Sequence, residues 1–129
     1  MTKILHLYIL TITLLVAHQI DSAYWHEWNL FGIPGGIQVF VLLNLPLVLF
    51  FLVGLAKVAT GVQKGGWYSL TLATVGAATF FIHLGLAWRQ HPEFGMPASW
   101  AILCGTLLAS LALGWRTLGV LRTNKGKQA

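Results

Sequence analysis

The sequence predicts an all-α integral membrane protein, a four-helix bundle in which each helix crosses the bilayer. Composition is the first indication, because 57% of the residues are hydrophobic and only 9% are charged, against about 25% charged residues in soluble domains. The second indication is four apolar runs, each near the ~20 residues that a membrane helix needs. Short connections between these runs in a chain of 129 residues predict a single membrane domain, residues 1–129.

The first apolar run fits either a membrane helix or a signal peptide. It is expected to continue as a helix beyond the bilayer to Leu30, because neither glycine nor proline occurs before Gly32. Its basic start and small residues at Ala17 and Ala23 also fit a cleaved signal peptide. We favour a retained membrane helix, because the run is long for a signal core and polar side chains interrupt it. The four helices are expected over about residues 4–30, 37–60, 67–91 and 97–120, with a basic tail over 121–129.

Glycine and proline define the expected connections between the helices. Gly32, Pro34 and Gly36 predict a chain reversal after the first helix, since glycine permits positive φ and proline cannot continue a helix interior. The glycine-rich stretch 61–66 predicts a flexible loop, and Pro92 is expected to end the third helix. These connections make the four helices alternate in direction.

The distribution of charge predicts the orientation of the bundle. With four spans, one side carries seven of the eight basic residues, and the other side carries all three acids. The positive-inside rule then places both termini in the cytoplasm. The net charge of +5 does not indicate nucleic-acid binding, because the basic residues flank apolar helices and form no basic face with stacking aromatics. The seven basic residues are Lys3, Lys57, Lys64, Arg116, Arg122, Lys125 and Lys127.

Histidines and acids gather where the first helix is expected to leave the bilayer. Within ten residues, from His18 to Glu27, the chain carries two of its five histidines and two of its three acids. On a continuous helix His18, Asp21 and His26 lie on one face within an arc of about 140°, while Glu27 points the opposite way. Charged and histidine side chains are costly at membrane depth, so this cluster indicates a site.

A short internal similarity connects this cluster to the third helix. In each copy two histidines eight positions apart precede a Phe-Gly-x-Pro turn at the outer end of a helix. Such a repeat predicts two parallel helical hairpins, with the first histidines of both copies as counterparts at equal depth; chance similarity in an apolar chain is the alternative. The copies are His18, His26 and residues 31–34 in the first, and His83, His91 and residues 94–97 in the second.

Metal binding is the chemistry that this set of residues predicts. Imidazole and carboxylate groups bind divalent ions such as Zn or Fe. Such an ion would lower the pKa of a bound water for a hydrolytic or redox reaction, with Glu27 as the catalytic base, or Glu93 in the same role. The candidate metal ligands are His18, Asp21, His26, His83 and His91.

Two alternatives belong to other classes of protein. One is a small b-type cytochrome, with His18 and His83 as axial haem ligands and Arg89 beside a haem propionate. The other is a non-catalytic membrane subunit or assembly factor, in which the polar cluster makes structural hydrogen bonds. Its small-residue helix faces would then dock to partner membrane helices or to a second copy of the chain, in addition to the lipid bilayer.

The sequence also resembles a known group of proteins. His18-Gln-Ile-Asp21 followed by His26-Glu27-Trp28 is similar to the pattern in uncharacterised small multi-pass bacterial membrane proteins, which are grouped as a domain of unknown function. The resemblance covers residues 16–31 and 83–94. It implies a four-helix fold in a bacterial inner membrane and no particular activity. The functional candidates that it implies are His18, Asp21, His26, Glu27, His83 and His91.

Overall fold

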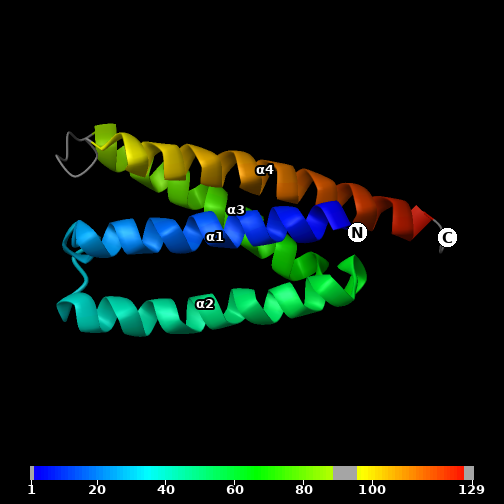
Figure 1. Ribbon diagram of the computed structural model, residues 1–129, viewed down its shortest axis with the longest axis horizontal. Coiled ribbons are helices and arrows are strands. Elements are labelled where there is room, and N and C mark those ends of the chain that lie inside the picture. The colour runs from blue at the N-terminus through cyan, green and yellow to red at the C-terminus, as the bar shows by residue number, and fades with distance from the viewer. Residues whose placement is uncertain (1, 89–95, 127–129) are drawn as a thin grey trace.

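The computed structural model describes residues 2–88 and 96–126, which form an up-and-down bundle of α-helices. In Figure 1, α1 and α3 run in one direction and α2 and α4 in the other. No strand occurs in the described residues, so the predicted all-α four-helix class is confirmed. The elements are α1 (Thr2–Tyr24), the short 3-10 helix η1 (Glu27–Asn29), α2 (Gly36–Thr60), α3 (Val62–Trp88) and α4 (Pro97–Gly126).

All four α-helices in the described part of the chain are long and apolar enough to cross a membrane. Their apolar segments contain 23 to 28 residues. At about 1.5 Å per residue, even the shortest exceeds the ~30 Å hydrocarbon core of a bilayer. Length and composition therefore agree with the four membrane spans that the sequence predicts.

The two ends of the bundle carry opposite charge. Figure 1 shows the start of α1, the end of α4 and the junction of α2 and α3 at one end, and the connection between α1 and α2 at the other. Lys3 and Lys64 belong to the first end by their positions in α1 and α3, whereas Asp21 and Glu27 belong to the second. This is the asymmetry that the positive-inside rule relates to a cytoplasmic and an outer end. Below, the end that carries the α1–α2 connection is called the outer end.

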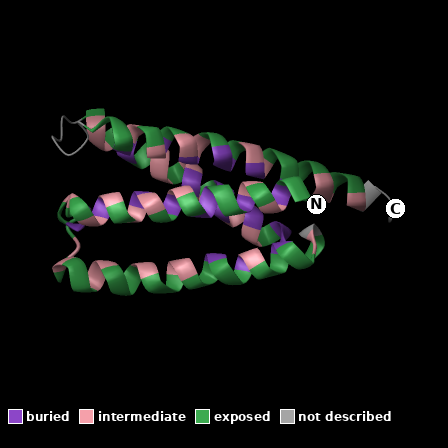
Figure 2. Ribbon diagram, in the orientation of Figure 1, coloured by how far each residue is buried: buried purple, intermediate pink, exposed green. Residues whose placement is uncertain are grey.

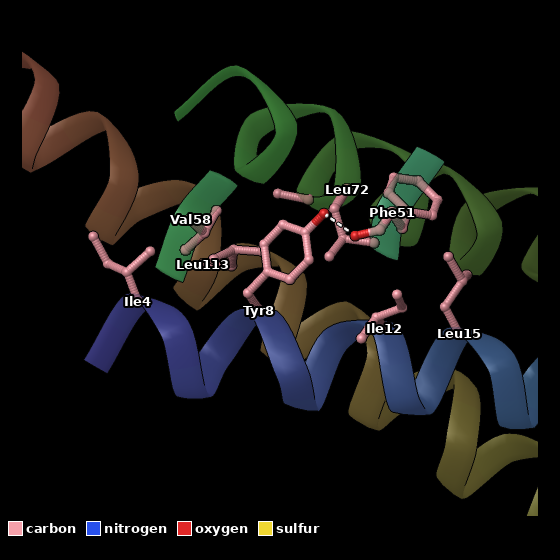
Figure 3. Close-up of a cluster of buried hydrophobic side chains, with 9 residues drawn as sticks. Ile4, Tyr8, Ile12, Leu15, Phe51, Val58, Leu72 and Leu113 are labelled. Atoms are coloured by element: carbon pink, nitrogen blue, oxygen red, sulfur yellow. Dashed lines mark hydrogen bonds between the residues drawn. The ribbon is translucent and has the colours of Figure 1, made fainter. Parts of the chain in front are cut away.

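The apolar core occupies the half of the bundle opposite the outer end. Tyr8 lies at its centre with 0% exposure, and the Tyr8 hydroxyl donates a 2.9 Å hydrogen bond to the carbonyl oxygen of Phe51. This buried bond joins α1 to α2 between residues 43 positions apart. Figure 3 shows the side chains around it, which come from all four helices: Ile4, Ile12, Leu15, Phe51, Val58, Leu72, Ala73 and Leu113.

Close helix contact in this half depends on glycine. A Cβ atom at Gly54 would meet the Tyr8 hydroxyl and the Tyr68 side chain. At Gly65 it would lie 2.5 Å from the Cα and N atoms of Val58. Glycine therefore lets the backbones of α2 and α3 approach, as small residues do at helix contacts in membranes.

The outer half of α2 packs much less tightly. The buried residues of α2 are Phe51, Gly54 and Val58, all in its second half. Residues 36–50 are exposed or half-buried throughout, and Figure 2 shows this part of the helix mostly in green and pink. Pro46 lies within it and removes one backbone donor. α2 is thus anchored at one end and loosely packed at the other.

The first helix is shorter than the sequence indicated. It ends at Tyr24, where a continuous helix to Leu30 was expected. The interruption is His26, whose φ of 54° and ψ of 41° lie in the left-handed region. Histidine is among the few residue types that are enriched there, so a helix can end without glycine or proline.

The start of α3 and the end of α4 also differ from the boundaries that the sequence predicts. The expected loop over 61–66 reduces to Gly61, whose φ of 140° reverses the chain, and α3 begins at once at Val62. At the other terminus α4 continues to Gly126, through part of the expected basic tail. Leucine and arginine, which occur in this stretch, are good helix formers.

Candidate metal centre

Two histidines from different helices meet inside the outer half of the bundle. His18 of α1 is 3% exposed and His83 of α3 is 4% exposed. Their ring centroids are 4.5 Å apart, with the ring planes at 86°. The prediction that these two histidines face each other across the bundle is confirmed.

Glu27 reaches the same point because α1 ends early. After the left-handed His26, the chain turns into η1, and the Glu27 side chain lies back against the bundle with 3% exposure. Glu27 Oε2 accepts a 2.6 Å hydrogen bond from the Ser22 hydroxyl and lies 2.9 Å from His83 Nε2. The expectation that Glu27 points away from His18 was therefore wrong, because it assumed a straight helix through this segment.

The two imidazoles and the carboxylate form a compact group of donor atoms. One ring nitrogen of His18, one of His83 and one carboxylate oxygen of Glu27 all lie within 4.8 Å of one another. Two ligands of one zinc ion, each at about 2.0 to 2.2 Å, stand roughly 3 to 4 Å apart. Small side-chain movements would thus bring all three donors to a single ion. We call these three residues the His–Glu–His cluster.

A hydrogen bond of His83 shows which of its ring nitrogens carries a proton. His83 Nδ1 lies 2.7 Å from the Thr79 carbonyl oxygen, which can only accept, so Nδ1 carries a proton. His83 Nε2 then faces the Glu27 carboxylate at 2.9 Å. This approach requires a second proton on the ring, a proton on the carboxyl group, or a cation between them. The geometry therefore requires a proton or a cation shared by the two groups.

Glu27 supplies the negative charge of the cluster. Burial alone would raise its pKa, but hydrogen bonds from His83 and Ser22 and the charges of His83 and His18 hold the pKa of Glu27 below its ordinary value. The carboxylate is ionised as a result. An ionised carboxylate this deeply buried is stable only when it is paired with positive charge or binds a metal.

His18 keeps an unused acceptor. Its Nε2 lies 3.3 Å from the Ser22 oxygen. Because Ser22 gives its own proton to Glu27, this contact assigns a proton to His18 Nε2 and leaves a lone pair on Nδ1. His18 Nδ1 is buried and has no hydrogen-bond partner in the described residues. A buried polar atom in this state costs roughly 1 to 3 kcal/mol unless a water, an ion or a ligand pairs with it.

A cavity of about 270 Å³ adjoins the cluster, and we call it the polar cavity. The His–Glu–His cluster, Ser22 and Thr79 form part of its wall, and residues of α1, α2, α3 and the α1–α2 connection form the rest. It offers room for water or for an oxygen-bearing group beside the donor atoms. Its further lining residues are Gln19, Phe31, Ile33, Phe40, Leu43, Asn44, Leu47 and Ile82.

The other predicted site residues do not join the cluster in the described structure. Asp21 is half-buried one turn after His18 and is not part of the group of three. His26 is exposed, and its ring packs edge-on against Trp28 with centroids 4.9 Å apart. His91 lies outside the described residues, as do Arg89 and Glu93.

Sequence reasoning did not include Ser22 among the site residues. The signal for it was present, because Ser22 follows His18 by four residues and therefore shares its helix face. Thr79 precedes His83 by the same spacing and contributes a backbone carbonyl. Both histidines are thus oriented by a group one helical turn away on their own helix.

Fold and site together define an all-α protein with four helices able to cross a membrane and a buried cluster of two histidines and a glutamate. The chain belongs to DUF6713, a family of unknown function, whose sequence profile matches residues 4–120. The matched range contains every residue of the cluster. No curated protein and no solved structure matches the chain significantly.

Proposed function

We propose that this protein is an integral membrane protein that binds one divalent metal ion, Zn or Fe, through His18, Glu27 and His83. The observation that carries the proposal is the convergence of their three donor atoms within 4.8 Å in a buried site. Two imidazoles and one carboxylate are the protein ligands of hydrolytic zinc sites and of non-haem iron sites. Such a set leaves coordination positions open for water or substrate.

The surroundings of the cluster support this assignment. Histidines that bind metals usually donate their second ring N–H to a carbonyl or carboxylate, which fixes the tautomer and the orientation of the ring. His83 makes such a bond to the Thr79 carbonyl at 2.7 Å. Ser22 orients the carboxylate in the same way, by donating to Glu27 Oε2 at 2.6 Å. The groups around the cluster thus hold two of the three donors in place.

The open side of the cluster determines the chemistry that it can support. A bound divalent ion would polarise a carbonyl or phosphoryl oxygen and activate a water, which favours a hydrolytic reaction. In this arrangement Glu27 is a ligand, whereas the sequence predicted it as the base. The cavity of about 270 Å³ next to the cluster is where water and the reacting group would bind.

Metal analysis of the detergent-purified full chain tests the proposal. We expect about one Zn or Fe per chain after incubation with either ion and removal of the excess, because three donors already converge. His18→Ala and His83→Ala should each weaken binding enough that well below one ion per chain is retained after the excess is removed. Wild-type protein that retains neither ion would contradict the proposal and would leave the cluster as a structural ion pair.

The two alternative functions, a b-type cytochrome and an accessory membrane subunit, predict different observations. A haem between His18 and His83 needs iron and a porphyrin between the rings, whereas these rings are in edge contact at 4.5 Å. α1 and α3 would have to separate to admit it, and the visible spectrum of protein purified from haem-supplied cells tests that. For an accessory subunit the expected result is a co-purifying membrane partner and no bound metal.

The charge asymmetry supports an orientation with the His–Glu–His cluster near the outer face and both termini in the cytoplasm of a bacterium. Single cysteines at Lys64 and Pro34, in a Cys104→Ala background, test it by labelling with an impermeant maleimide in intact cells. We expect labelling at Pro34, in the outer connection, and protection at Lys64. The reverse pattern would overturn the orientation.

A further inference from the structure

A large apolar groove lies between the outer halves of α1 and α2, directly beside the polar cavity. Its volume is about 680 Å³, within the ~300 to 1,000 Å³ of typical ligand sites. Only two of its lining residues, Gln19 and Asn44, are polar. The lining is Val16, Gln19, Ile20 and Ala23 from α1, and Phe40, Val41, Asn44, Leu45, Val48, Leu49 and Leu52 from α2.

The groove and the polar cavity share part of their walls. Gln19, Phe40 and Asn44 line both of them. These three side chains stand between the two volumes, so a molecule in the groove lies one side chain away from the cavity that Glu27 and His18 line. Apolar volume leads directly to a small group of convergent polar atoms, which is the combination that defines a ligand site.

The groove exists because α2 is loosely packed at this end. Val41, Leu45 and Leu49 are 51%, 65% and 60% exposed. Apolar side chains exposed on a membrane helix are covered by hydrocarbon, since contact with water is unfavourable. At this level the hydrocarbon would belong to lipids of the outer leaflet. The polar cavity, which His18, Ser22 and Glu27 line beside the groove, marks the polar end of this site.

We propose that the groove holds an acyl chain of a glycerophospholipid from the outer leaflet, whose ester and phosphate oxygens enter the polar cavity. The chemistry of the ligand's oxygens rests on the proposed metal, because a divalent ion binds and polarises carbonyl and phosphoryl oxygens. Binding of the chain does not depend on it. A phospholipid combines the two parts that the site offers, a long apolar volume and a polar end that can bear charge.

Photo-crosslinking in vesicles of phosphatidylglycerol tests this with two probes that differ only in the position of a diazirine. A probe with the diazirine at the chain end should label Val48, Leu49 and Leu52, deep in the groove. A probe with the diazirine beside the glycerol should label Gln19 and Asn44. Mass spectrometry of peptides from the full chain locates the adducts. The opposite order of labels, or equal labelling of the distant exposed residues Leu108 and Leu111, would overturn the proposal.

A matched pair of variants separates a site from ordinary lipid contact. Val41→Trp fills the groove, whereas Leu42→Trp places the same side chain on the neighbouring position, which is 68% exposed and lines neither cavity. Val41→Trp should reduce groove labelling about tenfold, the factor that corresponds to losing the burial of roughly two methylene groups. Leu42→Trp should leave it unchanged, and equal labelling of both variants would contradict the proposal.

The same experiment separates the two proposals from each other. Labelling with the chain-end probe is also measured in protein treated with a chelator, because binding of the chain does not depend on the metal. Groove labelling with a negative metal analysis would refute the metal centre and support the lipid site. Stoichiometric metal without localised labelling would support the metal centre and refute the lipid site.

Discussion

Replacing Glu27 with glutamine is expected to weaken zinc binding by roughly two orders of magnitude or more, beyond the 10- to 100-fold typical of losing a group that only orients a ligand. Glutamine has nearly the same shape, and its amide oxygen can still accept the hydrogen bond from Ser22. It carries no charge, however, and a neutral amide cannot replace a carboxylate ligand of a divalent ion. Competition with a chelator of known zinc affinity, in detergent, measures the change.

Asp21→Asn is the matched control for this result. It removes the same single charge from the same end of the bundle, and Asp21 is not part of the His–Glu–His cluster. We expect its zinc affinity to stay close to that of the wild type. Strong loss with Asp21→Asn and none with Glu27→Gln would contradict the cluster and would restore Asp21 as the acidic ligand that the sequence predicted.

Gly65→Ala is expected to lower the free energy of unfolding by about 1 to 3 kcal/mol, the usual cost of overpacking a tight contact. The new Cβ would lie 2.5 Å from the Cα and N atoms of Val58. Because these are backbone atoms, no side-chain rotation relieves the contact, and α2 and α3 must separate. Unfolding of the detergent-solubilised protein by a denaturing detergent measures the effect.

Gly85→Ala provides the control within the same helix. A Cβ at Gly85 has nothing within 4 Å, so this variant tests the change in residue type without the contact. It should be neutral or gain up to about 1 kcal/mol from the higher helix propensity of alanine. Equal losses at Gly65 and Gly85 would contradict the close approach of α2 and α3.

The sequence was sufficient for the class of fold and for one contact at the candidate site. Long apolar runs can satisfy their backbone in a bilayer only as helices, which made the four helices predictable. The meeting of His18 and His83 followed from placing both at the outer ends of parallel helices, and their rings are indeed in contact. The internal repeat from which that placement came stays a prediction, because its second pair includes His91, outside the described residues.

The position of Glu27 could not be predicted, because it depends on the backbone of one residue. The left-handed conformation of His26 ends α1 and directs Glu27 toward His83. Nothing in the sequence distinguishes such a histidine from one that continues a helix. A straight helix, the simpler assumption, sends the carboxylate to the opposite side.

The structural role of the glycines at 61, 65 and 66 also could not be predicted from the sequence. Gly61, Gly65 and Gly66 together indicated a flexible loop, yet only Gly61 has a positive φ among them. Gly65 and Gly66 lie in α3, where the absence of a side chain allows contact with Val58 and Leu121. The sequence shows that glycine is present but does not show whether it provides a turn or a close contact.

X-ray absorption spectroscopy of the zinc-loaded protein tests the central claim most directly, because it reports the atoms bound to the ion. The cluster predicts a first shell with two imidazole nitrogens at about 2.0 to 2.1 Å and carboxylate oxygen at about 2.0 to 2.2 Å. The imidazole scattering should fall to that of one ring in His83→Ala protein loaded at excess zinc. A shell of oxygen alone, or one containing the sulfur of Cys104, would show that the ion binds elsewhere and that His18, Glu27 and His83 do not form a metal centre.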